Sequence, residues 1–389
     1  MNLLDEEIIC LKNWADGKKA SPSRIQVEPT FKCNLKCIYC GRHSKKFDYK
    51  SELPDEKWKS IGKDIADIGF KSVILSGEGE IFCEPKRTLE LAALFKKNNL
   101  NGSMITNGTL LNEKIIETLV RIKWDDMVIS IDGSKAEIHD RLSQIKGSFG
   151  RVLKNLYLIK KYKKKYNTVY PELCFITVVT NRNYRDFPNI IKLAKDVNCR
   201  KITFMPLFNS ENIESHSFLK ISDSEYASLV NVMADVKKLA EEYNIETNSD
   251  HVLERLKPFY NDKIKTKDNI KTIIKTSKSD LKKIDSKDKN KKEGKEQKPW
   301  EPCYQPWLTM TLAADGVCRA CCFLHDIKDS VQDKSLNEVW FGPIFNKLRE
   351  RVYNQGSVPG CESCAEPVIL RNKQLERELK KRKISFKVS

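Results

Sequence analysis

"VEPTFKCNLKCIYCGR", residues 27–42, places Cys33, Cys37 and Cys40 within eight residues, directly behind a strand-like run. Three thiolates on one loop can hold a metal, but they cannot complete a tetrahedral site. Either a fourth ligand comes from another segment, or one metal position stays open for a small molecule. The remainder of the sequence has to decide between these two arrangements.

The chain's 389 residues are enough for two domains, or for one large α/β domain with an appendage. Its hydrophobic fraction of 40% suits a globular protein, and no run approaches the roughly 18–20 apolar residues that span a bilayer. Asp5, Glu6 and Glu7 stand where a signal peptide would carry positive charge. We therefore expect a cytoplasmic protein with no membrane partner.

In a reducing compartment the 13 cysteines are not expected to form a disulfide framework, so clustered ones are read as metal ligands or catalytic thiols. Three cysteines lie at 33–40, six lie between 303 and 364, and four lie elsewhere. Single cysteines such as Cys10, Cys174 and Cys199 are most simply small buried hydrophobic residues.

The net charge of +17 resembles that of a nucleic-acid-binding protein, but much of the excess is local. Residues 261–298 carry 14 lysines against 7 acidic residues and no aromatic residue for base stacking. Such a composition is typical of a solvated, partly disordered linker. We take the segment as a domain boundary and expect no nucleic-acid partner; the alternative is a basic arm that binds substrate.

Between residue 24 and about residue 240, strand-like and helix-like segments alternate. Strands are expected at 24–29, 71–77, 102–108, 126–133, 172–180 and 200–207, and helices at 53–69, 84–99, 111–122, 149–165 and 185–198. Six βα units of this kind predict an α/β fold with a parallel sheet and helical crossovers.

Four turns with unusual composition follow strands of this sheet: the cysteine loop, "SGEGE", "TNG" and "IDG". The glycines in them could serve only to turn the chain. However, the carboxyl ends of parallel strands share one rim, and ligands bind at that rim. The four turns together therefore indicate a functional site.

The cysteine loop could hold an iron–sulfur cluster, with zinc as the competing interpretation. A four-iron cluster takes a thiolate at each iron, so three thiolates leave one iron for another ligand. A structural zinc ion favours four protein ligands, and the nearby His43 is read as a solvent-exposed side chain.

Cys33-x3-Cys37-x2-Cys40 in the loop after the first strand, with Tyr39 before the last cysteine, resembles the radical S-adenosylmethionine (SAM) superfamily. The resemblance covers roughly residues 20–240 and implies a partial (β/α)6 TIM-like barrel. It also implies that the three cysteines hold a [4Fe-4S] cluster whose open iron binds SAM. Reduction then splits SAM and releases a 5′-deoxyadenosyl radical.

"SGEGE" resembles the glycine-rich SAM motif of the same superfamily. Aligned as Gly77-x-Gly79-Glu80, it implies that Glu80 holds the methionine ammonium and that the glycines let the backbone approach the ligand. Ile81 stands where proline is common in the family, and Glu78 is a rival for the role of Glu80.

"ISIDGSKAEIHDRL" and "GSFGRVLKNL" also resemble superfamily segments. By this resemblance Ser130 and Arg151 are candidates for the methionine carboxylate and the ribose, and Tyr39 for a further cofactor contact. Arginine suits a carboxylate, but Arg151 could equally be a surface charge on a helix.

A second cysteine group follows the linker. Cys303 precedes two β-like runs that turn at Asp315-Gly316, a helix through Trp340 and Phe345 comes next, and a Cys-x2-Cys pair closes the group. This layout resembles the SPASM/Twitch extensions of radical SAM enzymes. The family pattern selects as ligands of one auxiliary [4Fe-4S] cluster Cys303, Cys321, Cys361 and Cys364.

Cys318 and Cys322 are left over by that assignment. Adjacent residues of a strand face opposite sides, so Cys321 and Cys322 are not both expected to bind one cluster, and Cys322 remains the rival of Cys321. A zinc ribbon is the other explanation, because four cysteines satisfy zinc equally well.

The resemblance implies a domain order of N-terminal helix (1–19), radical SAM core (20–245), helix and linker (246–299), auxiliary cluster domain (300–370) and basic tail (371–389). We expect hydrogen abstraction from the substrate, a two-electron oxidation completed through the auxiliary cluster, and a donor such as flavodoxin or ferredoxin. Only 23 residues precede the first strand, which favours a small polar metabolite such as a sugar or aminocyclitol over a peptide. The alternatives are a peptide- or protein-modifying maturase, or a zinc-ribbon nucleic-acid-binding module on an inactive barrel.

Overall fold

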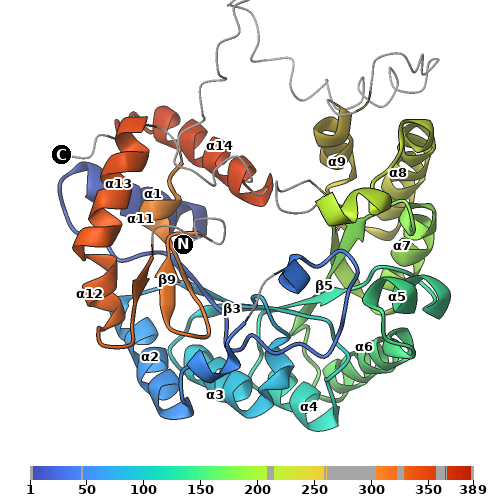
Figure 1. Ribbon diagram of the computed structural model, residues 1–389, viewed down its shortest axis with the longest axis horizontal. Coiled ribbons are helices and arrows are strands. Elements are labelled where there is room, and N and C mark those ends of the chain that lie inside the picture. The colour runs from blue at the N-terminus through green and yellow to red at the C-terminus, as the bar shows by residue number, and fades with distance from the viewer. Residues whose placement is uncertain are drawn as a thin grey trace, which may run out of the picture.

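The computed structural model describes residues 3–44, 47–207, 214–257, 260, 303–321, 328–355, 364 and 366–386. In these ranges the strands form one ten-stranded sheet with the order β10-β9-β8-β1-β2-β3-β4-β5-β6-β7. The sheet curves round with helices on its outer side (Figure 1). β10 and β7 are its two edges, so the sheet is an open, partial barrel.

Seven parallel strands make up the larger part of the sheet. They are β1 (Arg24–Val27), β2 (Ser72–Leu75), β3 (Asn101–Thr106), β4 (Asp126–Ser130), β5 (Glu172–Val179), β6 (Cys199–Pro206) and β7 (Glu246–Thr247). The first six lie where the alternation predicts strands, so the predicted α/β fold with a parallel sheet is confirmed. The seventh has two residues, too few for a detectable pattern.

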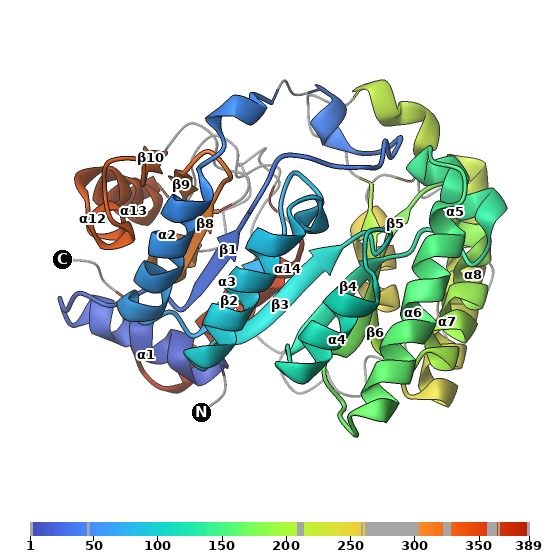
Figure 2. The same ribbon diagram turned by 90° about the horizontal axis from the view of Figure 1, so that it is seen from below.

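The helices that connect these strands cover the outer side of the sheet, as Figure 2 shows from a second direction. They are α2 (Asp55–Ile68), α3 (Pro85–Lys97), α4 (Glu113–Arg121), α5 (Ala136–Ser143), α6 (Ser148–Lys165), α7 (Phe187–Asp196), α8 (Asp223–Tyr243) and α9 (Ser249–Leu256). Their ends follow local sequence. α2 ends at Gly69, which adopts a left-handed conformation, and Asn112 caps α4 by accepting the Ile115 N–H at 3.0 Å.

The C-terminal segment joins the same sheet. β8 (Thr309–Leu312) pairs in parallel with β1, and β9 (Val317–Arg319) and β10 (Asp329–Ser330) continue in antiparallel order. The turn between β8 and β9 falls at Gly316, whose φ of +86° suits glycine. The hairpin that the sequence predicts is therefore a continuation of the barrel sheet.

Four further helices accompany this hairpin: α11 (Gln305–Leu308), α12 (Leu336–Trp340), α13 (Pro343–Gln355) and α14 (Glu366–Lys381). The single helix expected through Trp340 and Phe345 is broken in two, because Pro343 cannot continue a helix and starts α13. The expected boundary at residue 370 falls inside α14, whose Leu375 and Leu379 are buried. The lysine-rich segment 261–298 lies outside the described residues.

An ion-pair cluster ties the two ends of the chain to the sheet. Glu7 of α1 (Leu3–Ala15) is buried, and it accepts hydrogen bonds from Arg24 of β1 at 3.1 Å and from Arg371 of α14 at 2.6 Å. The two arginines compensate for the buried charge of Glu7. Because both are partly exposed, their own loss of hydration is limited. α1 and α14 lie side by side as a result (Figure 1).

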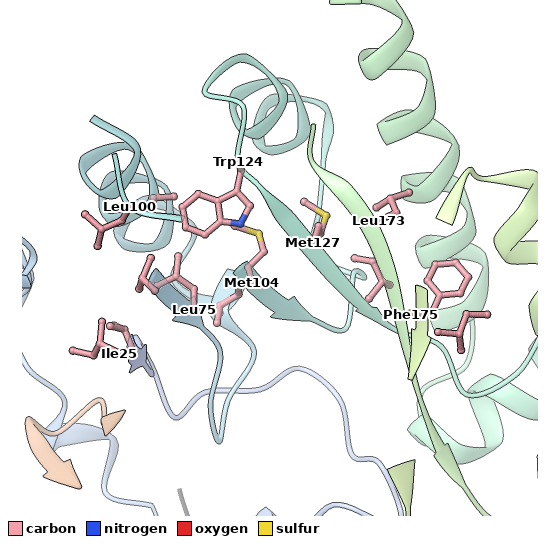
Figure 3. Packing of buried hydrophobic residues seen from close by; sticks show 14 of the residues in the cluster. Ile25, Leu75, Leu100, Met104, Trp124, Met127, Leu173 and Phe175 are labelled. Atoms are coloured by element: carbon pink, nitrogen blue, oxygen red, sulfur yellow. The ribbon is translucent and has the colours of Figure 1, made fainter. Parts of the chain in front are cut away.

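The core lies between the sheet and its helices. Alternate residues of each strand point outward into it, including Ile25, Leu75, Met104, Met127 and Phe175 (Figure 3). The other residues of the alternation are half-exposed on the concave inner face of the sheet.

Trp124 closes this core beside β3. Its indole N–H donates to the Asp126 carbonyl at 3.1 Å, which fixes the ring. The ring lies over Gly102, where an added Cβ would come within 2.4 Å of it. Among the helices of the described ranges, none has the length and apolar character needed to cross a bilayer.

Gly102→Ala is expected to lower the free energy of unfolding by about 1–3 kcal/mol, because a methyl group at this position overlaps the fixed Trp124 ring. The measurement is chemical denaturation. Gly150→Ala is the matched control. Gly150 lies in α6 with no atom within 4 Å of the added Cβ, so alanine should raise stability slightly, by about 0.5–1 kcal/mol. An equal effect of both substitutions would contradict the packing argument.

Candidate active site

The cysteine loop leaves the carboxyl end of β1 and runs across the rim of the sheet. Cys33, Cys37 and Cys40 are all half-buried, and the loop around them has no helix or strand until the 3₁₀ turn Gly41–Ser44. A loop without regular structure has to satisfy its backbone groups in other ways.

One anchor is the end of α5. The backbone N–H of Ile38 donates to Leu142 O at 2.9 Å, and that of Lys36 donates to Ser143 O at 3.1 Å. These carbonyls belong to the last turn of α5, where helices leave their C=O groups without intrahelical partners. The carbonyl groups at the end of one helix therefore hold the centre of the cysteine loop.

The second anchor is Glu52. Its Oε1 accepts the Thr30 hydroxyl at 2.9 Å and the Phe31 N–H at 2.8 Å. Arg87 lies 3.6 Å from the other carboxylate oxygen and donates to Pro29 O at 2.7 Å. The start of the loop is thus fixed by a partly buried ion pair.

The third anchor is the turn after β3. Asn34 donates to the Thr109 hydroxyl at 2.8 Å and accepts from the Asn107 amide at 2.9 Å. The "TNG" turn predicted to lie at the rim therefore contacts the cysteine loop directly.

The three thiols form one electrostatic group. Burial raises the pKa of Cys37 to about 12, with further contributions from Asp132 and Cys40, while a hydrogen bond with Tyr39 opposes the rise. Burial also raises the pKa of Cys33, to which Cys40 adds a small increase. Metal binding requires thiolates, so a cation at this loop would relieve the cost that keeps these thiols protonated.

These residues fit a [4Fe-4S] cluster by their chemistry: three soft ligands on a loop held from three sides. Within the described ranges, no three Cys, His, Asp or Glu side chains converge on one point as a single metal ion would require. A four-iron cluster places a different iron against each thiolate, so its ligands need not converge.

The two glycines of "SGEGE" allow close packing on the cysteine loop. An added Cβ at Gly79 would lie 2.5 Å from both Thr30 O and Lys32 O. At Gly77, where φ is +148°, it would lie 2.6 Å from Glu28. The sequence suggests that glycines at these positions let the backbone approach the ligand. The structure gives a second reason for them, because side chains here would prevent the contact between this loop and the cysteine loop.

Glu80 is buried where β2 and β3 end. Its Oε1 accepts the Thr106 hydroxyl at 2.6 Å and the Phe82 N–H at 3.1 Å, and its Oε2 accepts the Asn107 N–H at 2.7 Å. Burial raises the pKa of Glu80, and these three hydrogen bonds oppose the rise. Its rival Glu78 is half-buried, and its carbonyl accepts from Arg42 at 3.1 Å.

Tyr39 connects the cysteine loop to the "IDG" turn. Its hydroxyl donates to Oδ2 of the buried Asp132. The other carboxylate oxygen accepts the Val178 N–H at 3.0 Å, and the Asp132 N–H donates to His139 Nδ1 at 3.2 Å. Burial raises the pKa of both Tyr39 and Asp132.

Ser130 and Arg151 differ in their surroundings. Ser130 is the last residue of β4 and is half-buried on the inner face of the sheet. Arg151 lies in the first turn of α6 and is exposed. The start of that helix is fixed by Asp140, which accepts the Gly147 N–H at 2.6 Å and the Phe149 N–H at 2.8 Å.

The C-terminal cysteines lie around the β8–β9 hairpin. Cys303 and Cys321 are half-buried, and Cys364 has the same exposure before α14. Cys318 is fully buried in β9, and burial raises its pKa strongly, as for a thiol of the core. Cys361 and Cys322 lie outside the described residues.

Sequence reasoning missed several residues of this rim: Asn34, Thr106, Asp132 and Cys83. Burial raises the pKa of Cys83 to about 11, and the nearby Glu80 and Cys33 add to it, so this cysteine lies beside the cysteine loop. The "IDG" turn was a usable signal for Asp132. The "TNG" turn was likewise a signal for Thr106, whereas Asn34 and Cys83 belong to no motif that separates them from ordinary residues.

Two family models match the chain. Residues 27–194 match the model described as "Radical SAM superfamily", and residues 303–365 match the model described as "Iron-sulfur cluster-binding domain". The first range contains the cysteine loop, and the second contains the C-terminal cysteine group.

Curated relatives match part of the chain. An AdoMet-dependent heme synthase of Methanosarcina barkeri is 31% identical over 177 residues, which are 46% of this chain and 48% of that protein. The subtilosin biosynthesis protein AlbA of Bacillus subtilis is 31% identical over 142 residues, 36% of this chain and 31% of that protein. The matched region spans less than half of each of these relatives.

Solved structures share the fold over nearly the whole chain. Streptococcus suis SuiB bound to S-adenosylmethionine has a TM-score of 0.58 at 15% identity and covers 90% of this chain and 72% of its own. Native anSMEcpe with bound AdoMet has a TM-score of 0.58 at 18% identity, with 90% and 88% covered. At such identities the likeness concerns the fold alone.

Gly79→Ala is expected to abolish cluster binding by the cysteine loop, because the methyl group overlaps two backbone carbonyls that no side-chain movement can clear. The measurement is iron per chain after anaerobic reconstitution, with a loss of about four irons as one cluster requires. Gly150→Ala, a substitution into open space, should retain wild-type iron. If Gly79→Ala retains full iron, cluster binding does not depend on the close contact between the two loops.

Proposed function

Because the chain belongs to the radical SAM superfamily and carries a C-terminal SPASM-type iron–sulfur domain, we propose that it oxidises its substrate by radical chemistry. When bound, the [4Fe-4S] cluster and SAM supply a 5′-deoxyadenosyl radical, which takes a hydrogen atom from the substrate. The observation that carries the proposal is the cysteine loop, whose three thiols are held at the carboxyl rim of an open parallel sheet.

In this proposal Cys33, Cys37 and Cys40 hold the SAM-binding cluster, and Glu80 binds the methionine ammonium. A carboxylate is a suitable partner for an ammonium, and that of Glu80 is kept in one orientation by Thr106, Asn107 and Phe82. Gly77 and Gly79 keep its loop against the cysteine loop.

In this proposal Ser130, Arg151 and Tyr39 also lie near SAM, each in a different way. The half-buried Ser130 suits a contact to the carboxylate or ribose of SAM from the inner face of the sheet. The exposed Arg151 would have to reach the ligand by extending its long side chain over the rim. Tyr39 is held by Asp132 and supports the loop more directly than it supports SAM.

The auxiliary site would use Cys303, Cys321, Cys361 and Cys364. When loaded, such a cluster supplies an acceptor for the electron left on the oxidised substrate. The full burial of Cys318 within β9 supports its exclusion from the ligand set. In this proposal both clusters serve one substrate that lies along β1: Cys303 precedes β8 at the amino end of the β1–β8 pair, and the cysteine loop follows its carboxyl end.

The substrate would lie on the concave face of the sheet, beside the cysteine loop. Side chains that point to this face are half-exposed and mixed in polarity, among them Gln26, Ser103, Val128, Thr203 and Met205. Within the part of the chain that the structure describes, the sheet has two unjoined edges, at β10 and β7.

A peptide or protein is our preferred substrate class. SuiB bound to its precursor peptide SuiA shares the fold with a TM-score of 0.57, and the matched relatives include a PqqA peptide cyclase and a cysteine-type anaerobic sulfatase-maturating enzyme. The sequence alone favours a small polar metabolite, and that class remains the alternative. A one-electron donor such as flavodoxin or ferredoxin would complete the system.

Iron and sulfide per chain test the two clusters after anaerobic reconstitution. Wild type is expected to contain about eight irons, and the triple variant Cys33→Ala, Cys37→Ala, Cys40→Ala about four, as two four-iron clusters require. The triple variant should form no 5′-deoxyadenosine from SAM. If the wild type contains about four irons and the triple variant none, the auxiliary cluster is removed from the proposal. If the triple variant still cleaves SAM, the assignment of the cysteine loop is overturned.

The variant Cys303→Ala, Cys361→Ala separates the auxiliary site from the first. It should lose about four irons while it retains some abortive SAM cleavage, because the cysteine loop is intact. Cys318→Ala is the matched control and should keep wild-type iron, since Cys318 is a core thiol. Loss of iron from the control, with no loss from the double variant, would reverse the ligand assignment.

Glu80→Gln is expected to weaken SAM binding to the reconstituted protein by about tenfold or more, because a hydrogen-bonded charge is removed from the ammonium site. Equilibrium dialysis under anaerobic conditions measures this. Glu78→Gln makes the same chemical change two residues away and should leave the affinity within about twofold. A larger effect at Glu78 than at Glu80 would exchange their roles.

A further inference from the structure

The second half of α6 and the loop that follows it carry a concentrated positive charge. Residues 154–171 contain six lysines and no acidic residue. Five of these lysines are exposed: Lys154, Lys160, Lys161, Lys164 and Lys165. Cations in the last turn of a helix suit its dipole, but Lys154 and Lys160 lie further from the end of α6. The helix dipole alone therefore does not account for this cluster.

Apolar side chains are exposed in the same place. Tyr157, Lys161 and Lys164 are spaced by four and three residues, so they lie on one face of α6, and Tyr157 is 47% exposed. In the loop between α6 and β5, Val169 is 64% exposed and Tyr170 is 37% exposed. A single exposed hydrophobic residue needs no explanation, but here aliphatic and aromatic side chains adjoin a group of lysines.

The loop is held in one conformation by its own hydrogen bonds. Lys163 Nζ donates to Pro171 O at 2.9 Å, and the Thr168 N–H donates to Lys163 O at 3.0 Å. The Tyr170 N–H donates to the Thr168 hydroxyl at 3.1 Å. Val169 lies between these contacts, so its exposure is a property of the fold.

Acidic groups on neighbouring elements neutralise little of the charge. Glu117 of α4 pairs with Lys165 at 3.0 Å and accepts the Tyr166 hydroxyl. Lys160 donates to the backbone carbonyl of Asp196, at 2.6 Å. Among the described residues, no ion-pair partner is found for three of the exposed lysines: Lys154, Lys161 and Lys164.

An anionic lipid surface suits this combination of side chains. Lysines are attracted to negative headgroups, while aliphatic and tyrosine side chains enter the boundary between headgroups and acyl chains. A nucleic acid would instead use aromatic rings as stacking platforms. The Tyr166 ring is already stacked on that of Tyr162, with centroids 6.5 Å apart, and Val169 has no ring. The exposed aliphatic side chain therefore favours lipid over nucleic acid.

We propose that the second half of α6 and the loop 166–171 form a surface that contacts membranes containing anionic lipids. The loop leads into the amino end of β5, whereas the cysteine loop leaves the carboxyl end of β1, which runs in the same direction. The two segments lie at opposite ends of the sheet (Figure 2), so membrane contact leaves the rim facing the aqueous side. Such contact needs neither a spanning helix nor a signal peptide, the features whose absence leads the sequence to predict no membrane partner.

The test is sedimentation of the full 389-residue chain with phosphatidylcholine vesicles, prepared with and without phosphatidylglycerol. We expect binding only to vesicles that contain phosphatidylglycerol, and we expect it to weaken as salt is added. The double variant Lys161→Glu, Lys164→Glu should bind about tenfold more weakly or worse, since each lysine near such a surface contributes about fivefold.

Lys59→Glu, Lys63→Glu is the matched control. Both lysines are exposed on α2, on another side of the molecule (Figure 1), and their reversal changes the net charge equally. Because charges separated by more than a Debye length are screened, this variant should bind within about twofold of wild type.

Val169 separates insertion from attraction between charges. Val169→Leu adds one methylene group and should strengthen binding by up to about fourfold, whereas Val169→Asp should weaken it by about tenfold or more. All the substituted side chains are exposed, so the variants are expected to fold, and circular dichroism checks this.

Absence of binding to phosphatidylglycerol vesicles at low salt overturns the inference. So does binding that the α6 and Val169 variants leave unchanged, because contact would then be made elsewhere, as by the lysine-rich segment 261–298. A single-stranded oligonucleotide is the competing probe. If it binds in a way that depends on Lys161 and Lys164, while Val169→Asp changes binding of neither probe, the surface is assigned to nucleic acid and the lipid inference fails.

Discussion

The structure depends on the pairing of β1 along both of its edges. This four-residue strand lies between β2 of the barrel and β8 of the C-terminal hairpin, and it pairs in parallel with both. The cysteine loop begins where β1 ends. Because strands at both sides fix the position and direction of β1, a loop without regular structure can present three thiols in a defined place. Burial disfavours the thiolate form of these cysteines until a cation is bound.

Most of the fold follows from the sequence, because parallel strands buried by helices leave a strong pattern. Residues such as Val73 and Leu75 in β2, with Ile61 and Ile65 in α2, mark strand and helix by their spacing alone. The position of the C-terminal hairpin does not follow. β8 and β1 are nearly three hundred residues apart in sequence, and no local pattern of either strand specifies its neighbour.

The residues of the candidate site likewise fall into those that the sequence reveals and those that it does not. Cys33, Cys37 and Cys40 stand out because cysteine is rare and their spacing is short. The "IDG" turn draws attention to Asp132, but neither this turn nor Asn34 reveals its partner, since Asp-Gly and Asn residues are common in turns for reasons of backbone conformation. Their importance comes from hydrogen bonds between segments far apart in sequence, such as the one that Tyr39 donates to Asp132. Such pairings arise only when the strand order brings the turns to one rim.

The auxiliary hairpin also supports the first cysteine loop directly. Glu28 N–H donates to Leu312 O at 2.9 Å, and Leu53 N–H donates to Ala314 O at 2.8 Å. Phe31, two residues before Cys33, packs in a small cluster with Ala313 and Ala314. The tip of the hairpin is thus part of the wall that holds the cysteine loop. A change in the turn of the hairpin will therefore be felt at the cysteine loop through packing.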